Sequence, residues 1–60
     1  MKMQDITQHA HALYRAHGDR AEAEAAQKAR AEEDAGNPDE AENWHKIRRQ
    51  IKELRGPRAT

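Results

Sequence analysis

Large apolar side chains recur in the second half of this chain at the spacing of an α-helix. The stripe follows the order i, i+3, i+7, i+10 and comprises Trp44, Ile47, Ile51 and Leu54. Side chains at this spacing lie on one face of a helix. Val is absent and no run alternates β-branched with polar residues, whereas the strong helix formers Ala, Glu, Lys, Arg and Gln dominate. The pattern therefore predicts an all-α fold.

The first half of the chain continues the same helical spacing in two stripes, which differ in the size of their side chains. The first stripe is Met3, Ile6, Ala10, Leu13 and His17. The second stripe holds only small residues, Ala21, Ala25 and Ala29. Small residues permit close approach of a neighbouring helix, so large side chains of the second half can pack against them.

One turn is marked strongly by its residue types. Gly36 can adopt the left-handed conformation that closes a helix, and Pro38 suits the first position of the next helix. We therefore expect a turn at 36–37 and a helix over about 38–55, which Gly56-Pro57 ends. Residues 56–60 are expected to fray, and the whole chain, 1–60, forms a single helical domain.

The segment Gly18-Asp19 allows two interpretations. Gly costs about 1 kcal/mol relative to Ala inside a helix, but alanines and charged pairs around it favour one continuous helix over about 5–35. The alternative is a helix break at Gly18, after which residues 5–17 fold back and the chain forms a monomeric three-helix bundle.

A continuous first helix has a consequence for assembly. The chain becomes an antiparallel helical hairpin, and the apolar stripe before Gly18 extends beyond its partner helix. An uncovered stripe favours contact with another surface, so we expect two hairpins to form a four-helix bundle as a homodimer. The residues expected at this interface are Ile6, Leu13, His17, Trp44, Ile47, Ile51 and Leu54.

Composition narrows the class of protein. The chain has 60 residues, of which 35% are hydrophobic, and it contains no Cys. Such a length fits one small domain, and the absence of Cys excludes disulfides and thiolate metal sites. No apolar run approaches the roughly 20 residues of a membrane span, and no apolar stretch follows Met1-Lys2. We therefore expect a cytoplasmic protein without membrane contact.

Charge is balanced overall but unevenly distributed. Residues 19–42 carry nine acidic and three basic side chains, whereas residues 43–60 carry one acidic and six basic ones. The basic side chains of the last helix form a candidate binding face for nucleic acid or another acidic partner, namely Arg48, Arg49, Lys52 and Arg55. Some of these cations can pair with Glu22 and Glu24, and the zero net charge argues against nucleic acid.

Candidate chemistry is sparse. The four His residues include no pair at i, i+4 and no His-Glu-x-x-His motif. The three Gly residues are too dispersed to form a phosphate loop. We therefore expect no enzyme activity, no metal and no cofactor. The predicted function is that of a self-associating helical scaffold or accessory subunit, with the basic face as an alternative binding module.

Two resemblances accompany this interpretation. The stretch from His17 to Gln27, together with Glu42-Asn43-Trp44 and Ile51–Gly56, resembles small uncharacterised alphaproteobacterial proteins of about sixty residues, which implies no known activity. Separately, Gly18-Asp19 with Asn37-Pro38 and the Trp44–Ile47 spacing is similar to a single tetratricopeptide repeat. A single repeat cannot bury its own apolar face, so that resemblance implies a partner.

Overall fold

The described part of the chain consists of three α-helices joined by two short turns. The structure, a computed structural model, describes residues 2–56, with Met3 described by its backbone only. Helix α1 spans Met3–His17, α2 spans Arg20–Asp34 and α3 spans Pro38–Leu54. The all-α prediction is confirmed. The tail predicted to fray lies, from residue 57 onward, outside the described residues.

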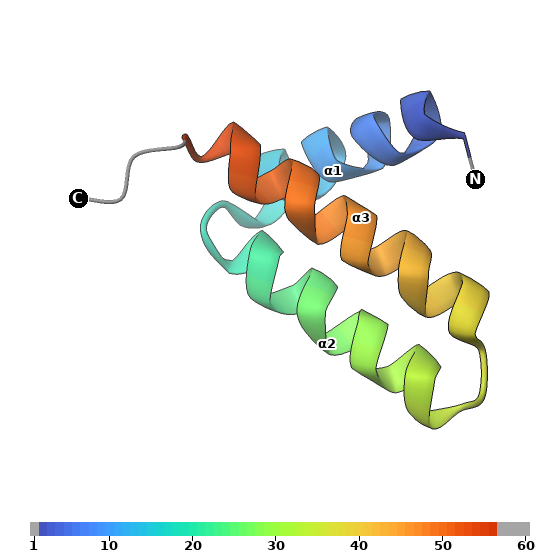
Figure 1. Ribbon diagram of the computed structural model, residues 1–60. Helices are drawn as coiled ribbons and strands as arrows, with labels where there is room; N and C mark the ends of the chain where they lie inside the picture. The colour runs from blue at the N-terminus through green and yellow to red at the C-terminus, as the bar shows by residue number, and fades with distance from the viewer. Residues whose placement is uncertain (1, 57–60) are drawn as a thin grey trace.

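The prediction of one continuous helix over about 5–35 is wrong, because the helix breaks at Gly18. This residue has φ 63° and ψ −136°, a conformation that is easy only for Gly. Its N–H donates to the carbonyl of Tyr14 at 2.7 Å, and its own carbonyl accepts from the N–H of Ala21 at 3.0 Å. The break lets α1 fold back over the other two helices (Figure 1). The physical reason is burial, since a straight helix would leave the α1 stripe in water.

The turn between α2 and α3 lies at the residues to which the sequence assigns it. Gly36 has φ 80° and donates its N–H to the carbonyl of Glu33, while the N–H of Asn37 donates to the carbonyl of Glu32. This pair of bonds is a Schellman motif, which satisfies carbonyls that the helix end leaves free. Pro38 then occupies the first turn of α3.

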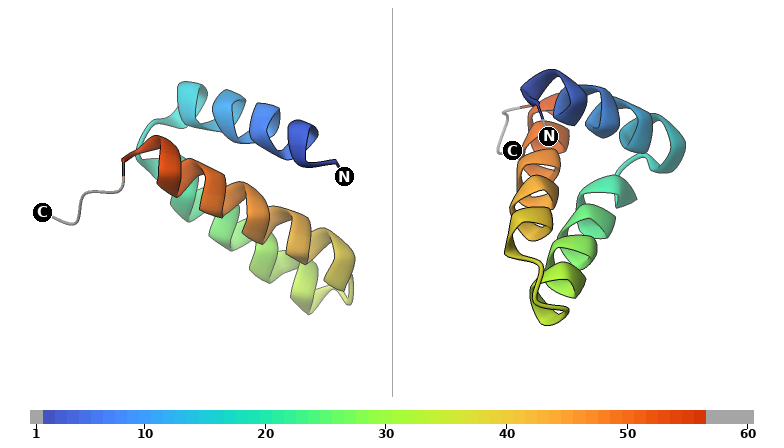
Figure 2. Two further views of the ribbon diagram at one scale, coloured as in Figure 1. Left: turned by 45° about the horizontal axis from the view of Figure 1, so that its top comes forward. Right: turned by 90° about the vertical axis from the view of Figure 1, so that its right-hand side faces the viewer.

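The helices alternate in direction. Helices α2 and α3 lie side by side and antiparallel, and α1 lies across the end of this pair that is remote from the 36–37 turn (Figures 1 and 2). Helix α1 contacts α3 more extensively than it contacts α2. The molecule measures 35 × 23 × 20 Å. The prediction of a four-helix bundle depended on an uncovered apolar stripe before Gly18. In the structure, the other two helices of the same chain cover this stripe.

All three helices contribute to the core. Its fully buried members are the apolar residues Ile6, Ala10, Ala21, Ala25, Ile47 and Ile51. Three larger side chains, Leu13, Tyr14 and Trp44, pack against this cluster and are partly buried. Bulky side chains of α1 and α3 thus meet the alanines of α2, as the size pattern of the sequence predicts.

Substitution of Gly18 tests the break. A Cβ at this position meets no atom within 4 Å, so Gly18→Ala changes only the backbone energy. We expect a loss of about 1–2 kcal/mol in the free energy of unfolding, measured by urea titration, because the left-handed region is strained for Ala. The exposed Ala16→Ser serves as a control in the same turn. An unchanged stability would contradict the assigned conformation.

Candidate interaction surface

The apolar residues expected at a homodimer interface lie mostly inside the single chain. Ile6 and Ile47 retain 1% of their exposure, and Ile51 retains none. Leu13 and Trp44 are half-buried against the same cluster. The three isoleucines are therefore fully occupied by intramolecular packing, whereas Leu13 and Trp44 keep part of their surface exposed.

Two other members of that set are at the surface. His17 is exposed, and its Nδ1 lies 3.4 Å from Oε2 of Glu24, so it belongs to a surface pair between α1 and α2. Leu54 is 37% exposed and is the one large hydrophobic residue classed as exposed among residues 2–56, with Met3 left aside.

A ring contact joins α1 and α3 and is not among the features predicted from the sequence. His9 of α1 packs against Trp44 of α3 with ring centroids 5.1 Å apart and an interplanar angle of 64°. This edge-to-face geometry is favourable for aromatic pairs. The only signal in the sequence was that His9 precedes the stripe residue Ala10, which places it at the edge of the buried face. Trp44 is thus a packing residue that fixes α1 on α3.

Several basic side chains are exposed along α3. Four side chains, which we call the basic strip, line one shallow depression of its surface: His45, Arg48, Arg49 and Lys52. All four are exposed, and Arg55 continues the same side of the helix one turn later. Three of the predicted residues, Arg48, Arg49 and Lys52, line this depression, whereas Arg55 lines a neighbouring one with Asp19 and Glu22. That these residues bind a partner stays a prediction.

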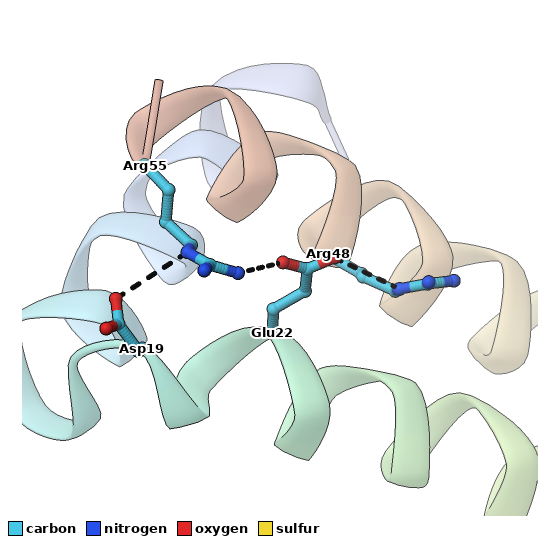
Figure 3. Close-up of polar contacts among 4 residues, drawn as sticks. All are labelled: Asp19, Glu22, Arg48 and Arg55. Carbon is cyan, nitrogen blue, oxygen red and sulfur yellow. Dashed lines mark hydrogen bonds and ion pairs between the residues drawn. The ribbon is translucent and has the colours of Figure 1, made fainter. Parts of the chain in front are cut away.

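Glu22 of α2 lies between two of these arginines (Figure 3). Its Oε1 accepts a hydrogen bond from Nη1 of Arg55 at 2.6 Å, and its Oε2 lies 3.8 Å from Nε of Arg48. Arg55 also faces Asp19, with 3.6 Å between Nε and Oδ1. The Glu22 side chain is only 19% exposed, the least of any group in these ion pairs. We call these four residues the Glu22 cluster.

The cations of α3 therefore differ in their availability. Arg55 is engaged by two carboxylates, Arg48 by one, and His45 by Glu33 at 3.2 Å. No ion pair with another described residue engages Arg49 or Lys52. Positive charge thus exceeds negative charge along the strip, and Arg49 and Lys52 are its most accessible cations.

Acidic residues gather at the opposite end of the hairpin. The group that we call the acidic tip flanks the 36–37 turn and comprises Glu32, Glu33, Asp34, Asp39, Glu40 and Glu42. Glu32 accepts a hydrogen bond from the amide of Asn37 at 2.9 Å, and Glu42 pairs with Lys46 at 3.7 Å. All except Glu32 are classed as exposed, so the tip presents several carboxylates to solvent.

Two further kinds of site, a metal site and a membrane-spanning helix, can be assessed in the described part of the chain. Residues 2–56 contain no group of three or more His, Asp or Glu side chains that could hold a metal ion. None of the helices in this range has the length and apolarity needed to cross a membrane. Comparisons with family models, with curated proteins and with solved structures found no match. Both resemblances noted in the sequence therefore stay predictions.

A cation that is engaged by carboxylates and a cation that is not should contribute differently to the free energy of unfolding. We expect Arg55→Gln to lower the free energy of unfolding by about 0.5–1 kcal/mol, because two ion pairs are lost at a half-exposed site. Lys52→Gln removes the same charge one turn earlier and should change stability by less than about 0.3 kcal/mol. Urea titration at low salt measures both. Equal losses would show that the Glu22 cluster is not a stabilising contact.

Proposed function

We propose that this protein is a non-enzymatic protein–protein interaction module, a small scaffold or accessory subunit that binds an acidic protein surface. The basic strip of α3 is the binding face, with Arg49 and Lys52 as its principal contacts. Carboxylates of the partner accept hydrogen bonds from these side chains and neutralise the excess charge.

The observation that carries this proposal is the contrast between core and surface. The large apolar residues Ile6, Ile47 and Ile51 are buried within the chain, so an apolar face is not the distinctive feature of its exterior. The basic strip is distinctive because four basic side chains line one depression of the surface, and two of them, Arg49 and Lys52, are engaged by no described carboxylate. Charged surfaces of this kind steer association and select partners by complementarity.

An acidic protein fits this face better than nucleic acid does. Trp44 and Tyr14, the only Trp and Tyr of the chain, are partly buried against the core and do not line the basic strip, so the strip offers bases no ring of either type on which to stack. The acidic tip lies on the same hairpin and repels an extended polyanion that follows α3. The strip adjoins the tip where His45 pairs with Glu33, but a partner of limited size can contact Arg49 and Lys52 without reaching the other carboxylates of the tip.

Binding to a short labelled polyglutamate peptide, which can contact Arg49 and Lys52 without extending along the acidic tip, tests the proposal. We expect the Arg49→Gln/Lys52→Gln double variant to bind about tenfold more weakly than wild type, which corresponds to about 1.4 kcal/mol. Fluorescence anisotropy at low ionic strength gives the dissociation constants. The matched control is Lys28→Gln/Arg30→Gln, which removes two exposed cations from α2. Equal weakening in both variants, or a clear preference for duplex DNA over polyglutamate, would argue against the assignment.

A second copy of the chain is the second candidate partner, and charge segregation favours it. The acidic tip of one molecule complements the basic strip of another, while the net charge of zero lets copies approach without overall repulsion. This contact is a homodimer held by charged surfaces. It differs from the four-helix bundle expected from the sequence, which needed an uncovered α1 stripe.

Sedimentation equilibrium at two salt concentrations tests self-association. We expect an average mass above 6.9 kDa at about 0.01 M salt and a return to the monomer mass at about 0.15 M, where the Debye length is about 8 Å. Lys52→Glu should abolish the low-salt increase. A mass that stays at 6.9 kDa in low salt would remove the second copy as a partner.

A further inference from the structure

We propose that Glu22 is an internal competitor for the binding face. In the free protein its carboxylate holds Arg48 and Arg55, and a carboxylate of the acidic partner takes its place on Arg48 when the two proteins associate. Glu22 therefore sets the affinity of the basic strip without contacting the partner. The inference rests on the proposed function and identifies the residue that regulates it.

The geometry of the Glu22 cluster supports competition. Two guanidinium groups from positions seven residues apart on α3 converge on one carboxylate, at 2.6 Å and 3.8 Å. Converging guanidinium groups are the usual means by which proteins bind a carboxylate from another molecule. Glu22 thus supplies, from within the chain, the same chemical group that the partner would supply.

The two arginines are held unequally, which identifies the one that exchanges. Arg55 is fixed by Glu22 on one side and by Asp19 on the other. Arg48 is engaged only through Nε, at a distance too long for a hydrogen bond, and its terminal amino groups extend away from Glu22 (Figure 3). Its side chain is 48% exposed. Arg48 can therefore turn toward a partner while Arg55 keeps Glu22 in place.

A positioning role for Glu22 makes the opposite prediction. If Glu22 served to hold Arg48 ready for the partner, neutralising it would weaken binding. If Glu22 only stabilised the fold, neutralising it would change binding no more than loss of any other surface carboxylate. The sign of the change in affinity therefore separates competition from positioning, and its size relative to the loss of another α2 carboxylate separates competition from a purely structural role.

The test compares Glu22→Gln with Glu24→Gln. Both variants remove one negative charge from α2, but Glu24 faces His17 rather than the basic strip. We expect Glu22→Gln to bind labelled polyglutamate roughly two- to fivefold more tightly than Glu24→Gln, the gain expected when an exposed ion pair no longer competes. Adding Arg48→Gln should cancel this gain. Equal affinities of the two single variants, or weaker binding by Glu22→Gln, would overturn the inference.

A second measurement uses the wild-type protein and does not depend on a variant that folds. The Nε–Hε resonance of Arg48 is followed by nuclear magnetic resonance while polyglutamate is added. We expect it to move toward a new position at saturation, whereas a resonance that stays in place during demonstrated binding would overturn the competition. If the wild type does not bind polyglutamate at low salt, the proposed function fails and the inference falls with it.

Discussion

Close packing of α3 on the alanine stripe of α2 is the contact on which the other features depend. Ala21 and Ala25 bring the two backbones near enough for Ile47 and Ile51 to be fully buried between them. The same approach brings Glu22 within reach of Arg48 and Arg55. A larger residue on this stripe would separate the helices and disturb both the core and the charged cluster. The close approach of α2 and α3 therefore determines both the packing of the core and the formation of the Glu22 cluster.

The position of α1 decides what kind of surface the molecule presents. Because the chain turns at Gly18, Ile6 and Ala10 cover the open end of the hairpin and complete the core. A continuous helix would have left these residues in water and would have made apolar association the dominant property. With α1 folded back, charge becomes the main difference between one part of the surface and another. The basic strip and the acidic tip stand out for that reason.

Much of the architecture follows from local sequence signals, but the decisive break does not. The periodicity of Trp44, Ile47 and Ile51 and the residues Gly36 and Pro38 indicate α3 and its preceding turn through local rules. At Gly18 the local signals conflict, and long-range burial outweighs the preference of the flanking residues for helix. The cations of the strip were predictable from helical spacing. Their division into engaged and accessible ones was not, because it depends on the register between α2 and α3.

The contact between His9 and Trp44 has a spectroscopic consequence. Trp44 is the only tryptophan of the chain, and it packs half-buried at the junction of α1 and α3. Its indole emission therefore reports the docking of α1, while far-ultraviolet circular dichroism reports helix content in all three segments. A folding step in which α2 and α3 pair before α1 docks would separate the two signals in time. The molecule thus carries its own probe for the order in which its helices assemble.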